Sequence, residues 1–234
     1  YLSGIFFYKL IYFKTSSQVI SFIGTSMYLL APKIYGNSFF DCKDLFFLSL
    51  FTICIYFFLK YEIKKSYKSL IIISLFFSFA TSSRIFGLML PISFFFLTFL
   101  EFLNTKEIHV LFSKILIFSL FYILFLYIQW PYMWVFNYNE IQNFFEPFRV
   151  HTNLKVFFNG EFFESNHLPF SYIPKWVAIS TPILYLFFFS VGTIHYIRRL
   201  FFRLIEMKDN TLTNDLWRGT SEKIDFFVFI SFLQ

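Results

Sequence analysis

Long apolar runs alternate with short polar segments along this chain of 234 residues. A helix that crosses a bilayer needs about 20 mostly apolar residues. Six runs approach that length, and two shorter ones lie at the ends of the sequence. The predicted spans are 1–13, 16–30, 45–59, 69–82, 86–103, 110–129, 176–197 and 224–234. The pattern therefore predicts an all-α, multi-pass transmembrane helical bundle.

Only Ser82, Ser83 and Arg84 separate the fourth predicted span from the fifth. One bent helix is the alternative at this point. Because the combined run of 69–103 is too long for one simple span, we expect two helices joined by a tight turn.

The polar segments fall into two groups, since successive spanning helices must leave the membrane on alternate sides. One group comprises the loops 60–68, 104–109 and 198–223, with Lys14 and Lys114 beside them. The other comprises the loops 31–44 and 130–175, with Arg84. The first group holds 13 lysines and arginines and the second holds six. The positive-inside rule predicts that the first group is cytoplasmic and the second external.

The longer external loop, 130–175, is bordered by tryptophan and tyrosine residues of the kind found at membrane interfaces. Inside it, apolar side chains recur at helical spacing. They are Ile141, Phe144, Phe145 and Phe148. We therefore expect this loop to carry a short helix that lies in the plane of the interface.

Composition supports lipid, rather than water, as the solvent of these runs. Hydrophobic residues make up 57% of the chain, and phenylalanine alone contributes 42 residues. Charged residues make up 15%, below the roughly 25% usual in soluble domains. The net charge of +6 does not indicate nucleic acid, because the cations lie between apolar runs. We expect an integral multi-pass protein of a bacterial inner membrane or an equivalent bilayer.

The familiar nucleotide and metal signatures are missing from the sequence. No Walker loop, GxGxxG, HExxH or CxxC motif occurs, and the four histidines are spread over both predicted sides. Cys42 and Cys54 are too few for a disulfide framework. Because the sequence starts at Tyr1 and stops inside an apolar run, we expect 1–234 to be one transmembrane domain that lacks both ends of the protein.

Three charges in four residues, Asp41, Lys43 and Asp44, precede an apolar run on the predicted external side. Two carboxylates beside an ammonium group can orient a sugar hydroxyl, accept a proton or hold a phosphate. The alternative is an ordinary solvated helix start with Asp44 as its cap.

Arg84 is a second candidate, because an arginine between two apolar runs is costly in lipid and is by default a functional residue. On the external face it could hold a phosphate with bidentate geometry. The alternatives are an arginine that snorkels at a helical hairpin and a partner for an acidic residue. A third candidate is the loop 158–174, where His167 and its polar neighbours lie among aromatic residues. Such a mixture suits a carbohydrate, although polar loop residues can simply face water.

Three stretches resemble the polyprenyl-phosphate-dependent glycosyltransferases of family 39, which are akin to protein O-mannosyltransferases and to the aminoarabinose transferases of lipid A. The first is APKIYGNSFFDCKDLFFLSLF at 31–51, where Asp41 and Cys42 stand in place of the asparagine and proline expected in the family. Residues that match there are Pro32, Tyr35, Gly36, Phe39, Phe40, Lys43, Asp44 and Phe46 or Phe47. The others are ATSSRIFGLMLPI at 80–92, with Arg84, Gly87 and Pro91, and the segment 158–186. That last segment matches at Asn159, Gly160, Leu168, Pro169, Tyr172, Pro174, Trp176, Thr181 and Pro182.

The resemblance implies a GT-C-type bundle and an inverting transfer of a sugar from a polyprenyl-phosphate donor to a protein or a lipid-linked glycan on the external face. The family's catalytic carboxylate would precede Tyr1, which leaves Asp44 as the candidate within this sequence. No resident cofactor is implied, and a divalent metal is compatible but not required. The implied substrate-binding residues are Tyr35, Asp41, Lys43, Asp44, Arg84, His167 and Tyr172. The alternatives are a multi-pass transporter or lipid flippase with Arg84 on its substrate path, and a membrane scaffold subunit.

Overall fold

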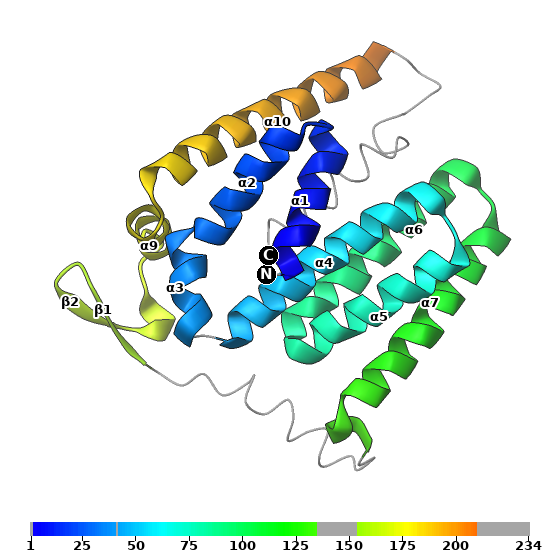
Figure 1. The fold of residues 1–234 in the computed structure, drawn as a ribbon, viewed down its shortest axis with the longest axis horizontal. Helices are drawn as coiled ribbons and strands as arrows, with labels where there is room; N and C mark the ends of the chain where they lie inside the picture. Colours follow the sequence, from blue (N-terminus) through cyan, green and yellow to red (C-terminus); the bar gives the residue numbers. More distant parts are fainter. Residues whose placement is uncertain (1, 41, 135–153, 210–234) are drawn as a thin grey trace. The chain divides into compact units, whose positions relative to one another are not determined.

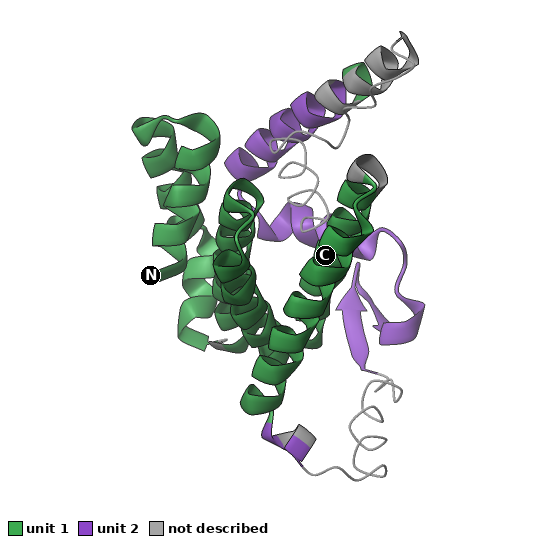
Figure 2. Ribbon diagram, turned by 90° about the vertical axis from the view of Figure 1, so that its right-hand side faces the viewer, with its two compact units in different colours: residues 1–130, 199–234 green, residues 131–198 purple. Residues whose placement is uncertain are grey.

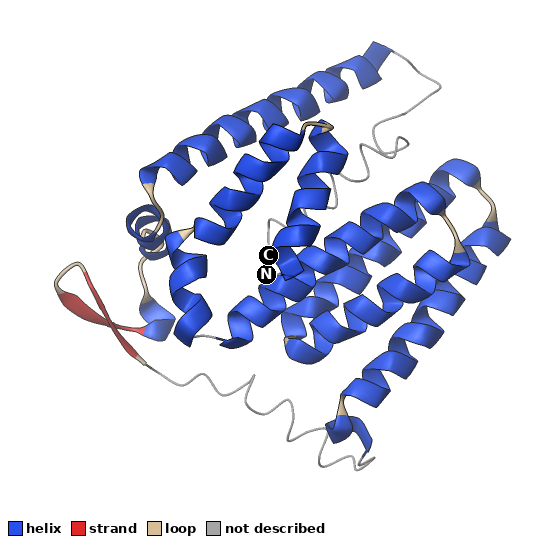
Figure 3. Ribbon diagram, viewed as in Figure 1, coloured by secondary structure: helices blue, strands red, loops and turns tan. Residues whose placement is uncertain are grey.

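The computed structural model describes residues 2–40, 42–134 and 154–209. The chain divides into two compact units, one of residues 1–130 with 199–234 and one of residues 131–198 (Figure 2). Each unit is described by itself. The described part of the chain is mostly helical (Figure 3).

The first unit is built of helices joined by short turns (Figure 1). They are α1 (Leu2–Thr15), α2 (Gln18–Leu30), α3 (Pro32–Phe40), α4 (Cys42–Lys64), α5 (Tyr67–Ser83), α6 (Met89–Thr105) and α7 (Ile108–Gln129), with a 3-10 turn η1 (Ile85–Leu88) before α6. The flanking helices extend into the predicted loops 60–68 and 104–109, so only two residues of each loop lie between helices. The predicted loop 31–44 is largely helical, because α3 occupies most of it.

Three of the tight turns use the same backbone device. Ser16, Lys65 and Lys106 each follow a helix and adopt a positive φ, of 53°, 48° and 56°. A single residue in this left-handed region ends a helix and reverses the chain. Ser17 and Ser66 then cap α2 and α5, since their hydroxyls accept hydrogen bonds from the backbone N–H groups of Ile20 and Ser69. Each pair of flanking helices is therefore antiparallel.

Among the described residues, three helical segments are long and apolar enough to cross a membrane: Lys43–Lys64, Ile85–Phe102 and Ile108–Gln129. The helices Gln18–Leu30 and Tyr67–Ser83 are apolar but shorter. The outer surface of α7 carries exposed side chains such as Phe112, Leu120 and Ile123. Contiguous apolar surface of this kind is unusual on soluble proteins and is expected where lipid is the solvent.

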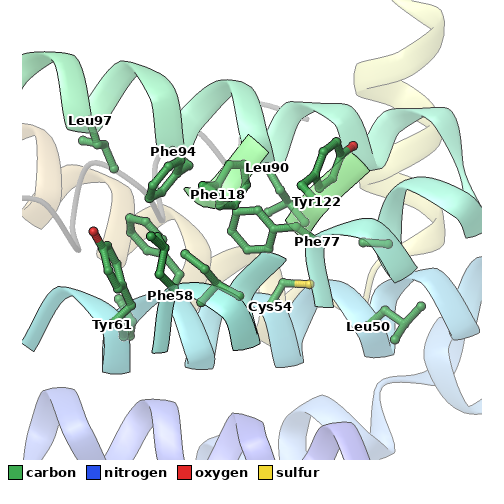
Figure 4. Packing of buried hydrophobic residues seen from close by; sticks show 14 residues of the cluster. Leu50, Cys54, Phe58, Tyr61, Phe77, Leu90, Phe94, Leu97, Phe118 and Tyr122 are labelled. Atoms are coloured by element: carbon green, nitrogen blue, oxygen red, sulfur yellow. The ribbon is translucent and has the colours of Figure 1, made fainter. Parts of the chain in front are cut away.

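The core of the first unit lies among α4, α5, α6 and α7, with α5 packed between α4 and α7. One fully buried phenylalanine comes from each helix: Phe58, Phe77, Phe94 and Phe118 (Figure 4). The ring centroids of Phe94 and Phe118 are 4.2 Å apart, and those of Phe77 and Phe118 are 6.0 Å apart. In lipid, such close packing supplies the cohesion that the hydrophobic effect supplies in water.

Hydrogen bonds between side chains also join α5 to α7. Tyr122 Oη donates to Thr81 Oγ1 over 2.9 Å, and Gln129 Nε2 donates to Ser78 Oγ over 3.1 Å. Ser82 Oγ donates to Gln129 Oε1 over 3.4 Å. Interhelical hydrogen bonds in membrane proteins contribute about 0.6 kcal/mol each on average. They fix the rotation of α7 against α5.

The second unit contains a feature that the all-α prediction missed (Figure 3). Strands β1 (Lys155–Phe158) and β2 (Glu161–Glu164) pair antiparallel, with Phe158 opposite Glu161. Asn159 and Gly160 form the two-residue turn, with φ values of 54° and 90°. Asn-Gly is the dipeptide that such a turn favours, because both residues accept positive φ. The hairpin leads through a 3-10 turn, η3 (Ser165–His167), to α9 (Tyr172–Ser180).

The predicted span 176–197 is not one straight helix. It divides between α9 and α10 (Ile183–Asp209), and the two helical segments are bent by 119°. The bend falls at Thr181 and Pro182. Proline disfavours the helical conformation of the residue before it, and Thr181 accordingly has extended backbone angles, φ −110° and ψ 128°. Counted as one broken span, this pair would be a fourth membrane crossing.

Two predicted elements lie outside the described residues. They are the interfacial helix around Ile141–Phe148 and the span 224–234.

Candidate functional site

The structure brings two of the predicted site residues together, although 39 residues separate them in the sequence. Arg84 forms an ion pair with Asp44, through its terminal nitrogen Nη2 and the carboxylate oxygen Oδ1. Arg84 lies just after the end of α5, and Asp44 lies in the first turn of α4. The antiparallel packing of α4 and α5 therefore places both charges at the same end of the bundle.

Local backbone geometry sets the position of Arg84. Its φ and ψ of −151° and 141° are extended, so the chain leaves the helical path at this residue. The Arg84 N–H still donates to the Ala80 carbonyl over 3.1 Å, which closes the last turn of α5. The Arg84 carbonyl in turn accepts from the Gly87 N–H over 2.9 Å, which begins η1. Arg84 thus starts a tight reversal between two helices, as the sequence predicted.

Gly87 makes this reversal sterically feasible. A Cβ atom at Gly87 would lie 2.5 Å from the backbone carbon of Ala80 and 2.5 Å from the backbone nitrogen of Thr81. Real side chains do not reach such distances to backbone atoms, so η1 can pack on α5 only with glycine here. Glycine at this position therefore has a physical reason in the contact between η1 and α5.

The ion pair is accessible to solvent or to a ligand. The side chain of Arg84 is 39% exposed and that of Asp44 is 48% exposed. Pairs this open contribute about 0–1 kcal/mol to stability. A competing anion can therefore replace the carboxylate at small cost. The position of Asp44 in the first turn of α4 also stabilises its negative charge, because the N-terminal end of a helix dipole is positive.

Polar groups on α5 and α7 flank the ion pair. Ser82 and Ser83 directly precede Arg84, and Ser82 is hydrogen-bonded to Gln129 at the end of α7. Lys43 is exposed beside Asp44, and within the described part of the chain its ammonium group has no acidic partner. This end of the first unit therefore offers a guanidinium, an ammonium and neutral hydrogen-bonding groups on an apolar bundle.

The remaining predicted site residues are distributed differently. Tyr35, on α3, is exposed and makes an edge-to-face contact with Phe39, with centroids 5.4 Å apart. Asp41 lies outside the described residues. His167 and Tyr172 belong to the second unit, where His167 is exposed and the ring of Tyr172 lies against Phe158, with centroids 5.2 Å apart. Whether these residues join Arg84 and Asp44 in one site stays a prediction.

No three His, Cys, Asp or Glu side chains come together as a metal site within the ranges that the structure describes. Asp41, a further carboxylate of the predicted site, lies outside those ranges, as does the segment 135–153.

Sequence reasoning overlooked a second set of charges, at the other end of the same helices. Lys65 Nζ lies 2.9 Å from Glu62 and 3.2 Å from Glu101, and Lys114 Nζ lies 3.1 Å from Glu101. The signal available in the sequence is the three-residue spacing of Glu62, in the last turn of α4, and Lys65, just after it. Nothing in the sequence pairs Glu101 with Lys114, because that contact depends on the packing of α6 against α7.

Comparisons of the chain with protein-family models, with curated proteins and with solved structures find no match. The resemblance to the family 39 glycosyltransferases therefore remains a prediction. The described geometry of the first unit is the basis on which a function can be proposed.

Proposed function

We propose that this chain forms part of a multi-pass membrane glycosyltransferase. It would move a sugar from a polyprenyl-phosphate donor to a protein or a lipid-linked glycan on the non-cytoplasmic face. The observation that carries the proposal is the half-exposed Asp44–Arg84 ion pair, which lies at one end of an apolar helical bundle beside the exposed Lys43. Such a group of charges suits a ligand with a phosphate headgroup and a lipid tail.

In this reaction the bond between the sugar carbon C1 and the phosphate oxygen breaks, and a bond from the acceptor oxygen to C1 forms with inversion. The leaving phosphate changes from a diester to a monoester and gains negative charge. Arg84 and Lys43 would stabilise that charge as it develops, which accelerates the reaction because the interaction is stronger in the transition state than in the ground state.

We assign Asp44 a positioning role, because its carboxylate is already bound to Arg84. In the resting state Asp44 would hold the guanidinium in place, and the donor phosphate would take over part of this contact. The acceptor proton would pass to a different carboxylate, which the family resemblance puts outside this sequence.

The test is the release of polyprenyl phosphate from a radiolabelled lipid-linked sugar by the full-length protein in membranes. We expect Arg84→Ala to lower turnover by about 10²- to 10³-fold, the loss typical when one donor to a developing anion is removed. Lys43→Ala should lower it less, because an exposed ammonium is screened by water. Lys155→Ala, an exposed lysine of β1, is the control and should retain turnover.

A charge swap separates catalysis from folding. In the double variant Asp44→Arg with Arg84→Asp, the ion pair can form again, so protein yield and melting temperature should approach those of the natural protein. Turnover should stay low, because the guanidinium is now attached to α4 at position 44 and no longer lies where it can contact the donor phosphate. Full turnover in Arg84→Ala would overturn the proposal, and so would transport of the intact lipid-linked sugar without glycosidic cleavage, which would favour a flippase.

A further inference from the structure

Two acidic side chains at the lysine-rich end of α4 to α7, Glu62 and Glu101, are paired with lysines of the same end, whereas Glu107 is exposed. Glu62 is only 5% exposed and lies against Lys65, and Glu101 accepts from both Lys65 and Lys114. The four charges form one network that joins α4, the α4–α5 turn, α6 and α7. Two carboxylates and two ammonium groups balance in these ion pairs, so the four groups carry no net charge.

The lysines on the outside of the same region are left without acidic partners. Lys60, Lys64 and Lys68 are exposed, and none of them forms an ion pair or a side-chain hydrogen bond within the described part of the chain. Lys60 and Lys64 are four residues apart on α4 and so lie on one face of the helix. Lys68 follows in the first turn of α5. The segment 60–68 therefore exposes lysines, while its one glutamate, Glu62, is buried.

Apolar side chains interleave with these lysines. Ile63 is 52% exposed and Tyr67 is 58% exposed, next to Lys64 and Lys68 in the sequence. A basic groove for a soluble polyanion would not need exposed isoleucine at this point. The boundary between lipid headgroups and acyl chains matches the pattern, because lysine stems lie along apolar surface while their ammonium groups reach the headgroups.

We propose that Lys60, Lys64 and Lys68 bind the headgroups of anionic phospholipids at this end of α4 and α5. The segment 60–68 contains four lysines, and each one that reaches the membrane surface adds to the attraction for anionic headgroups. Lys65 belongs to the internal network, so the lipid-facing set is the other three. The proposal requires the helices to lie in a membrane, but it does not depend on glycosyl transfer.

Native mass spectrometry of the detergent-solubilised full chain, titrated with phosphatidylglycerol, tests this binding. Each exposed lysine near a membrane surface strengthens anionic lipid binding about fivefold. We expect Lys60→Gln with Lys64→Gln to weaken the apparent affinity by about 25-fold. Lys60→Arg with Lys64→Arg keeps the charge and should keep the affinity. Phosphatidylcholine, which has no net charge, should bind all variants alike.

The matched control removes two exposed lysines elsewhere, Lys33→Gln with Lys155→Gln, and should leave the affinity near that of the natural chain. An equal loss in this control would show that binding follows net charge alone, and would overturn the proposal. Equal affinity for phosphatidylcholine and phosphatidylglycerol would overturn it as well. Folding is monitored separately by the melting temperature without added lipid, which should not change because Lys60 and Lys64 contact no described acidic group.

Discussion

The residues at the Arg84 turn show which features of the site can be predicted from the sequence and which cannot. The sequence singled out Asp44 and Arg84 separately, from their position beside apolar runs. It offered an acidic partner for Arg84 as one alternative and could not name it, because side chains 40 positions apart meet only through helix packing. The structure supplies the partner. An ion pair does not exclude a functional role, since a pair this exposed can exchange with a ligand.

Gly87 gives the sharpest prediction at this scale. Gly87→Ala places a methyl group against the backbone of Ala80 and Thr81, so η1 must move away from α5. We expect a loss of about 1–3 kcal/mol in stability, the range for overpacking a tight contact. The melting temperature in detergent measures it.

Gly192→Ala is the matched control, because a Cβ atom at Gly192 meets nothing within 4 Å. This variant should be neutral or slightly more stable, since alanine favours helix over glycine. Equal melting temperatures for Gly87→Ala and the natural chain would show that the close approach of η1 to α5 is not required.

At the scale of elements, apolar periodicity located most helices within a few residues. It failed where turn chemistry decides the outcome. The Asn159-Gly160 dipeptide between two Phe-containing stretches is the strongest short-range hairpin signal, but the periodicity of apolar runs does not detect it. Similarly, apolar character alone predicts one helix over 176–197, whereas Pro182 breaks this run into two helices.

The hairpin should depend on its glycine. Gly160 has a φ of 90°, which a β-branched residue adopts only with strain. Gly160→Val should cost about 1–3 kcal/mol locally and open the pairing of Val156 with Phe163. Hydrogen exchange of the amides in β1 and β2 should become faster, while amides in α4 and α5 keep their protection. Unchanged exchange in the strands would contradict this account of the turn.

At the scale of the whole molecule, the contacts of α4 to α7 bear out the alternating helix directions predicted from apolar runs. Asp44 and Arg84 meet at one end of these helices, whereas Lys65, Glu101 and Lys114 meet at the other. Within α4 to α7, the lysines of 60–68 and Lys114 therefore lie at one end, and Lys43 with Arg84 lies at the other. Which end faces the cytoplasm stays a prediction of the positive-inside rule.

Cysteine labelling tests that orientation. In a background in which Cys42 and Cys54 are replaced by serine, we expect Lys43→Cys and Trp134→Cys to react with a membrane-impermeant maleimide from the same, non-cytoplasmic side. Lys64→Cys should react from the opposite side, since α4 runs from Lys43 to Lys64 across the predicted membrane. Labelling of Lys43→Cys and Trp134→Cys from opposite sides would contradict the predicted topology and, with it, the proposed enzyme.

The sharp bend between α9 and α10 has a consequence for bilayers of different thickness. If α10 crosses the membrane near its normal, a bend of 119° leaves α9 about 30° from the bilayer plane, with Trp176 at the headgroup level that tryptophan prefers. α9 would then fix the depth in the membrane at which α10 begins. A thinner or thicker bilayer would be accommodated by tilting α10 about the Thr181–Pro182 joint, and the hairpin next to α9 would keep its height above the lipid.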